Sequence, residues 1–323
     1  MSEAGSVDQG RQALSDLPRR IADTRLQSVL IALLFTAICA GFGVLLGLMV
    51  LAFVVGGTVK ANSPLPTVWQ SAGILAGCAL LFGLAYAPVL VRTWRRGAGM
   101  VTQRAGARPV SSPEERRAAN VVEEMAVAAG APLPTVAIID DLALNCMAAG
   151  SRPGDATIAL TCGLIAALDR QELQAVAAHE LAHVINGDLR LNTYLAANSA
   201  NFGAFADSVL FEVYVEQAHA TQILVPVARI GRWLTSVTSL AALRKRELLA
   251  DYTAVMLTRD PAALVRALRK MAGSPQQMAC VHRDLANLYI VDPADPTSEG
   301  SRWRHSHPSL ANRIARLERA VVA

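Results

Sequence analysis

Two long stretches of this chain contain no charged residue, and they restrict its fold more than any other feature of the sequence. The first covers residues 27–58, with a nearly all-apolar core at residues 29–55, and the second covers residues 67–91. A helix of about 20 apolar residues is long enough to cross a bilayer. We therefore predict an N-terminal transmembrane helical hairpin within residues 26–96.

Further features of the two stretches favour this prediction. A cleaved signal peptide is the alternative for the first stretch, but its apolar region would be shorter, about 7–15 residues, and nearer the chain start. Gly41, Gly43 and Gly47 would let two helices approach each other closely in lipid. Trp69 and Trp94 lie near the ends of the second stretch, where aromatic side chains meet the membrane interface.

The positions of the basic residues predict the orientation of the hairpin. Arginines precede and follow the hairpin in the sequence, whereas Lys60 is the only basic residue between the two stretches. The arginines are Arg11, Arg19, Arg20 and Arg25 before the hairpin and Arg92, Arg95 and Arg96 after it. Basic flanks remain in the cytoplasm. We expect a multi-pass protein of the cell inner (plasma) membrane with a flexible cytoplasmic tail at residues 1–25 and a cytoplasmic domain at residues 97–323.

The composition agrees with a membrane protein. The chain is 53% hydrophobic and only 17% charged, which is too apolar for an ordinary soluble domain. Its net charge of +4 could suggest nucleic acid, but the basic residues flank apolar stretches and aromatic residues make up only 5%. We therefore expect the lipid bilayer, and no nucleic acid, as a partner. The five scattered cysteines indicate neither a disulfide framework nor a cysteine zinc site.

The cytoplasmic part contains the motif His179-Glu180-Leu181-Ala182-His183. Histidines four residues apart share one face of a helix, so both imidazoles can bind one metal ion. The carboxylate of Glu180 can then act as a general base towards water. A helix with two incidental histidines is the alternative.

The residues around the motif predict that it lies on a helix. Asp169 can cap the helix start, with Glu172 three residues later completing a capping box. Gly187 can adopt the left-handed conformation that ends a helix. The motif thus has the helical setting that metal binding by its two histidines requires.

Other local signals predict a mostly α (α+β) fold with a small sheet. Asn145 lies on the connection between the two predicted strands. The predicted elements are a linker at residues 97–108, a helix starting at Ser112, strands at 135–139 and 157–161, helices at 244–257, 262–271 and 310–321, and an exposed loop at 291–304.

Residues 191–243 are rich in Ala, Leu and Val, but charged residues such as Asp207 and Arg229 interrupt them. This pattern favours a helical insertion whose amphipathic helices pack on the domain or lie against the membrane surface. Two further membrane spans are the alternative.

A catalytic zinc site needs a third protein ligand. Asp188, Glu212, Glu216 and Glu247 are the candidates. Asp188 lies too close along the same helix end. Glu247 has Asp251 one turn later, which could accept a hydrogen bond from a ligand histidine. The alternative for Glu247 is a surface carboxylate paired with a basic residue.

The ordered motifs resemble the HtpX-like membrane zinc metallopeptidases, relatives of the CAAX prenyl proteases, from the hairpin to about Leu317. Cys146 and Met147 replace the Ala-Phe that is usual in that family. Besides the HExxH motif with Gly187-Asp188, the matching segments are residues 145–150, 247–251, 289–293 and 307–310 with 313–314.

The resemblance implies a zinc metallopeptidase domain of the gluzincin type with one zinc ion per chain. The implied residues are the zinc ligands His179, His183 and Glu247, the catalytic residues Glu180, Asn145 and His307, and the ligand-supporting residues Asp251 and Arg313. Asn145 and His307 would face the substrate carbonyl. His219, His282 and His305 match nothing in the family.

The implied activity is a stress-response endopeptidase in quality control, acting on protein or peptide substrates, chiefly membrane proteins. An intramembrane protease is disfavoured, because charged residues directly precede the HExxH helix. A non-catalytic membrane scaffold or sensor that keeps the metallopeptidase fold is the alternative from another functional class.

Overall fold

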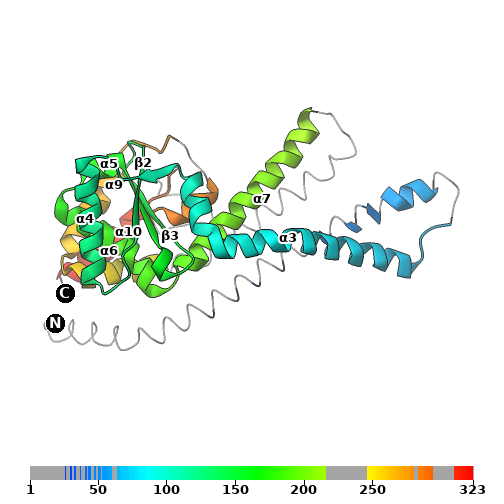
Figure 1. Cartoon of the computed structure of the whole chain (residues 1–323), viewed down its shortest axis with the longest axis horizontal. Coiled ribbons are helices and arrows are strands. Elements are labelled where there is room, and N and C mark those ends of the chain that lie inside the picture. The colour runs from blue at the N-terminus through cyan, green and yellow to red at the C-terminus, as the bar shows by residue number, and fades with distance from the viewer. Residues whose placement is uncertain are drawn as a thin grey trace.

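The structure is a computed structural model that describes residues 64–215, 246–279, 283–293 and 309–322, together with part of the segment 26–59. A compact part contains the sheet and most helices, and two long helices, α3 (Val68–Arg104) and α7 (Leu189–Val215), extend from it (Figure 1). The architecture is mostly helical with a small mixed sheet, as predicted. The predicted tail at residues 1–25 lies outside the described residues.

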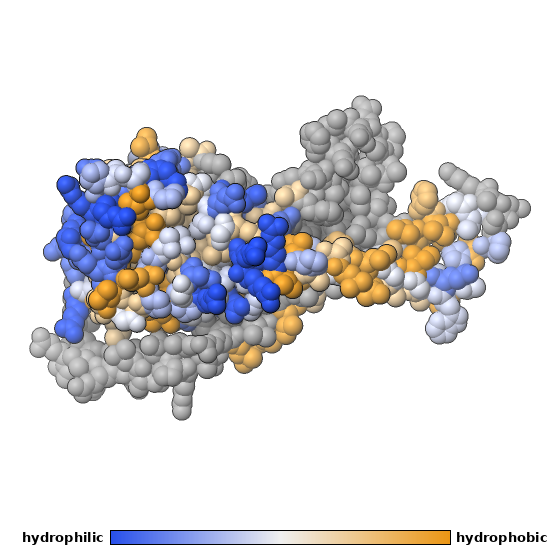
Figure 2. All heavy atoms as spheres, viewed as in Figure 1, coloured by the Kyte–Doolittle hydropathy of each residue, from blue (hydrophilic) through white to orange (hydrophobic). Residues whose placement is uncertain are grey.

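Helix α3 contains the second charge-free stretch and begins at a capping box. The Thr67 hydroxyl accepts a hydrogen bond from Gln70 N, and the Gln70 side chain accepts one from Thr67 N. Of the described helices, α3 is the one long and apolar enough to cross a membrane: an 18-residue window has a mean hydropathy of 2.3 and none of it is buried. Figure 2 shows apolar side chains along the projecting part of α3.

The predicted linker at residues 97–108 is wrong for most of its length, because α3 continues to Arg104. The helix bends at Arg96, whose backbone is non-helical (φ −129°, ψ 16°). Directly after the bend, Gly97 faces α7, and a Cβ added there would lie 3.2 Å from Thr193 Cγ2. This tertiary packing stabilises the helix across glycines that locally weaken it.

Of Gly41, Gly43 and Gly47 in the first apolar stretch, two lie against α3. A Cβ added to Gly43 would lie 3.0 Å from Ala79 Cα, and one added to Gly47 would lie 3.1 Å from Leu75 Cα. Among the described residues, none lies within 4 Å of a Cβ added to Gly41. The close approach expected of these glycines thus occurs at Gly43 and Gly47 and not at Gly41.

The helices of the compact part begin where the sequence predicts. Ser112 and Glu115 form a reciprocal capping box at the start of α4 (Pro113–Ala128). Asp169 and Glu172 do the same for α6 (Arg170–Asn186), which ends at Gly187 with φ 77°. The later helical segments are residues 246–258, α9 (Pro261–Gly273) and α10 (Leu310–Val322).

The sheet has four strands in the order β1-β2-β4-β3. The predicted strands are β2 (Thr135–Ile139) and β4 (Thr157–Thr161), which pair in parallel. β1 (Ala107–Pro109) and β3 (Cys146–Ala149) pair antiparallel at the two edges. The expected connection around Asn145 therefore contains a strand. All four β3 residues are buried, so β3 lacks the alternation that reveals a half-exposed strand.

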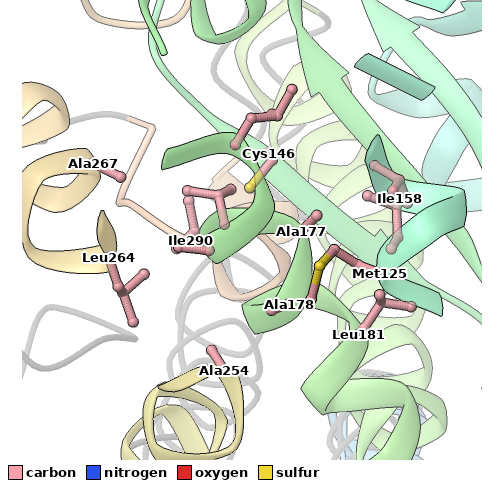
Figure 3. Close-up of a cluster of buried hydrophobic side chains, with 14 of the residues drawn as sticks. Met125, Cys146, Ile158, Ala177, Ala178, Leu181, Ala254, Leu264, Ala267 and Ile290 are labelled. Carbon is pink, nitrogen blue, oxygen red and sulfur yellow. The ribbon is translucent and has the colours of Figure 1, made fainter. Parts of the chain in front are cut away.

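Helix α6 packs in the centre of the compact part. Figure 3 shows its residues Ala177, Ala178 and Leu181 near Met125 of α4 and Ile158 of β4. Small alanine side chains let the α6 backbone approach β3 closely. The short helix α5 (Cys162–Ala167), which no sequence signal predicts, follows β4 on the way to α6.

Helix α7 follows α6 directly and covers the first half of the region 191–243. It packs against α3 and against the 3₁₀ helix η3 (Arg283–Leu288). The buried Asn198 amide donates to Thr93 Oγ1 of α3 at 3.0 Å. The remainder of the region, residues 216–245, lies outside the described residues.

Candidate metal centre

Helix α6 presents two histidines on one face, as its motif predicts. The rings of His179 and His183 lie 5.1 Å apart and nearly perpendicular, and both are buried. Glu247, from the helical residues 246–258, joins them. The candidate ligand atoms of these three residues lie within 4.8 Å of one another.

Each histidine is oriented by a carboxylate on the side away from Glu247. His179 Nδ1 lies 3.0 Å from Asp251 Oδ1, and His183 Nδ1 lies 3.2 Å from Asp188 Oδ1. A proton on Nδ1, donated to these carboxylates, leaves each Nε2 with a lone pair. The two Nε2 atoms lie 3.6 and 3.7 Å from the Glu247 carboxylate oxygens.

This arrangement fits a metal ion. The Nε2 atom of His179 is buried and makes no hydrogen bond within the described part of the chain. Its lone pair, the lone pair of His183 and the Glu247 carboxylate all face the same small space. Three electron-pair donors repel one another there unless a cation lies between them, and two imidazoles with a carboxylate are a donor set that zinc accepts.

The electrostatics of the site also favour a cation. Burial lowers the pKa of both imidazoles, but the nearby carboxylates outweigh it. Asp251 and Glu247 raise the pKa of His179, and Asp188 raises the pKa of His183 to about 10. The carboxylates thus attract positive charge to the two rings, which a bound metal ion would supply in place of the added protons.

Arg313 of α10 supports the site from behind Asp251. Its side chain is fully buried, and it donates to both Asp251 oxygens at 2.9 and 2.6 Å and to Ile290 O at 2.9 Å. Burial raises the pKa of Asp251, but Arg313 and His179 more than offset this and lower it. Asp251 thus stays ionised and available to His179, and the supporting role expected of these two residues stays a prediction.

Glu180 lies beside the two histidines and is also buried. Its Oε1 accepts a hydrogen bond from Cys146 Sγ at 3.2 Å, whereas its Oε2 is buried and has no hydrogen-bond partner among the described residues. Burial is the largest influence on its pKa and raises it. Burial and the neighbouring Glu180 also raise the pKa of the Cys146 thiol.

Asn145 is buried, and its amide binds backbone groups. Its Nδ2 donates to Val291 O at 2.9 Å, and its Oδ1 accepts from Cys146 N and Val291 N. These bonds tie β3 to the segment 289–291, where Ile290 N also donates to Cys146 O. The amide is thus engaged in this structure, and its expected role towards a substrate carbonyl stays a prediction.

Several predicted residues lie outside the described part of the chain. His307 is one of them, as are Glu216, His219, His282 and His305, and the side chain of Glu212 is likewise not described. The expected role of His307 therefore stays a prediction.

Two residues beside the site make contacts that the sequence did not predict. The sequence indicated Asp188 only as a ligand candidate, but it contacts the outer nitrogen of His183. A ligand histidine usually donates its outer N–H to such an acceptor. The aspartate just past the helix end was therefore the sequence signal that could have predicted this contact. The Cys146 contact with Glu180 arises from tertiary packing, and no sequence signal points to it.

Comparison with known proteins agrees with this geometry. The model of a family described as Peptidase family M48 matches residues 112–321. A protein named Protease HtpX homolog from Streptococcus agalactiae is 31% identical over 314 residues, covering 93% of this chain and 99% of the relative. A protein of the same name from Leuconostoc citreum is 33% identical over 256 residues, covering 75% and 84%.

One solved structure, titled Crystal Structure of S. mikatae Ste24p, was also matched. It is 17% identical with a TM-score of 0.38, and the match covers 97% of this chain and 74% of that chain.

Proposed function

The chain belongs to peptidase family M48, and from this premise we propose that it is a membrane-anchored zinc metalloendopeptidase of the gluzincin type. One zinc ion per chain would be held by His179, His183 and Glu247. The observation that carries this proposal is the convergence of three buried electron-pair donors, with both imidazoles oriented from behind by carboxylates.

The chain's own residues supply the proton transfers of peptide hydrolysis. A zinc ion in such a site provides Lewis acidity, which polarises a carbonyl and makes water more acidic. Glu180 Oε2, which has no hydrogen-bond partner among the residues described, takes a proton from the attacking water and later passes it to the leaving amine. The raised pKa of Glu180 suits both transfers, because a base of higher pKa binds the proton more readily.

Asn145 and His307 are proposed to donate hydrogen bonds to the oxyanion. For Asn145 this requires its Nδ2 to exchange the bond to Val291 O for one to substrate.

The proposed setting is a hairpin at residues 26–96 in the cell inner membrane, with the catalytic domain at residues 97–323 in the cytoplasm. The exposed apolar length of α3 and the arginines at its end support this topology. Misfolded or damaged membrane proteins are the proposed substrates, and quality control is the proposed role. Residues 191–243 would form a membrane-associated helical insertion.

Metal analysis and casein cleavage on detergent-purified protein test the proposal. Wild type should contain one zinc per chain and cleave casein. Glu180→Gln should keep the zinc, because no ligand changes, but lose about 10²–10⁴-fold in rate. Glu247→Ala should lose both zinc and activity, because two histidines alone leave the ion under-coordinated.

Each contrary result has a distinct meaning. Stoichiometric zinc in Glu247→Ala would mean that the third ligand is another residue, with Glu212 and Glu216 the next candidates. Cleavage by Glu180→Gln at the wild-type rate would remove Glu180 as the base. A wild type with neither zinc nor activity would favour the scaffold or sensor instead.

A further inference from the structure

The thiol of Cys146 is the hydrogen-bond donor that the structure places on Glu180. Sγ lies 3.2 Å from Oε1, and both residues are almost fully buried, with exposures of 0% and 1%. The other oxygen, Oε2, is buried and makes no hydrogen bond to any residue that the structure describes. The two oxygens of the carboxylate are therefore distinguished: one is anchored and the other is free.

The backbone of Cys146 is fixed on several sides. Within the sheet it pairs with Leu160 of β4. On the other side its carbonyl accepts from Ile290 N at 3.0 Å, and its own N–H donates to Asn145 Oδ1 at 3.0 Å. Because the backbone of Cys146 is held in place, its thiol has a well-defined position. The hydrogen bond from this thiol can therefore restrict the position of the Glu180 carboxylate.

We propose that Cys146 is a positioning residue for the general base, holding Glu180 Oε1 so that Oε2 faces the water to be activated. The inference rests on the proposed function of Glu180. The last torsion of a glutamate is broad, so an unanchored carboxylate would sample orientations in which neither oxygen is well placed. Catalysis by a positioned base depends strongly on such preorganisation.

Packing alone is the competing explanation, because Cys146 also belongs to the main hydrophobic core. A buried free cysteine often behaves as a small hydrophobic residue. In that case any apolar residue of similar size would serve. If the hydrogen bond matters, only a residue that can donate to Glu180 will preserve the rate.

Three substitutions at one position separate these explanations. Cys146→Val keeps an apolar side chain of similar bulk but removes the donor, Cys146→Ala removes both, and Cys146→Ser restores a donor on a slightly shorter bond. Cys162→Ala is the matched control, because that half-exposed thiol contacts Asp140 at 3.4 Å, outside the site. Bound zinc, thermal unfolding temperature, kcat and KM are measured for each full-length protein in detergent.

We expect Cys146→Val and Cys146→Ala to lose about 10-fold in kcat, with KM and zinc content unchanged, as the loss of one hydrogen bond to a charged group predicts. Cys146→Ser should recover most of that loss, and Cys162→Ala should match wild type. A Val variant as fast as wild type, or a Ser variant as slow as the Val variant, would overturn the positioning role alone. An inactive wild type would overturn both this role and the proposed function.

Discussion

The two imidazoles of the metal centre are oriented by different carboxylates, and these carboxylates have different surroundings. Asp188 is buried against His183, whereas Asp251 is shared between His179 and the fully buried Arg313. Loss of either carboxylate frees one ligand ring. Loss of Asp251 also leaves a buried guanidinium without its main ion-pair partner, which is far more costly to the fold.

This difference predicts different outcomes for two alanine substitutions. Asp188→Ala and Asp251→Ala should each weaken zinc binding by about 10–100-fold, as loss of a ligand's supporting group does. Asp251→Ala should in addition lower the free energy of unfolding by about 3–5 kcal/mol. Competition with a zinc chelator measures the first effect, and thermal unfolding in detergent measures the second. Equal unfolding temperatures for the two variants would contradict the asymmetry.

At the scale of elements, signals within one helical turn predicted the fold best. The capping boxes at Ser112 and Asp169 specify helix starts locally, and both starts agree with the structure. Elements that depend on tertiary contact were missed. The buried strand β3 has no alternation to reveal it, and the glycines after Arg96 suggested a linker where packing on α7 maintains a helix.

The site shows the same difference between local signals, which can be predicted from sequence, and tertiary contacts, which cannot. The HExxH motif predicts two metal ligands and a general base, because these residues lie on one turn of one helix. The proposed third ligand, Glu247, lies 64 residues after His183, beyond a segment with no clear pattern. Its neighbour Asp251 favoured it, and the resemblance to the family then selected it from the other carboxylates. The partners of Asn145 and Cys146 come from the segment around Ile290 and from α6, and no local pattern encodes such contacts.

The contact between α3 and α7 can be tested with two neighbouring glycines of α3. Gly97 is buried against Thr193, whereas Gly99 is exposed and has open space around it. Gly97→Leu should separate the helices and cost about 1–3 kcal/mol of stability. Gly99→Leu should stabilise α3 slightly, because leucine favours helix over glycine. Thermal unfolding in detergent compares the two, and equal shifts would mean that the helix contact contributes little.

At the scale of the whole molecule, the chain consists of an apolar projecting part and a more hydrophilic compact part. Apolar side chains cover the projecting part of α3, and hydrophilic ones predominate on the compact part in the view of Figure 2. Exposed apolar surface of this extent marks a contact with lipid or protein. The arginines at the end of the apolar stretch indicate which side of the membrane the compact part occupies.

Reporter fusions test this orientation. A reporter fused after Arg96 should behave as cytoplasmic and one placed near Ser63 as external, because arginines flank the hairpin on its outer sides and only Lys60 lies within the loop. An alkaline phosphatase that is active only outside the cytoplasm provides the measurement. The opposite pattern would place the catalytic domain outside the cell membrane.

The bend at Arg96 and the contact at Gly97 determine how far the enzyme can reach. On the proposed topology, α3 leaves the bilayer near Val91 and continues as helix to Arg104, a rise of about 20 Å at 1.5 Å per residue. Helix α7, which directly follows the HExxH helix, is fastened to α3 along this rise. Asn198 of α7 also donates to Thr93 of α3 before the bend, so both helices together set the distance of the active site from the bilayer. The distance and orientation of the active site relative to the bilayer are therefore fixed by the geometry of these two helices. The peptide bonds that the active site meets first are those that emerge from the membrane at that distance.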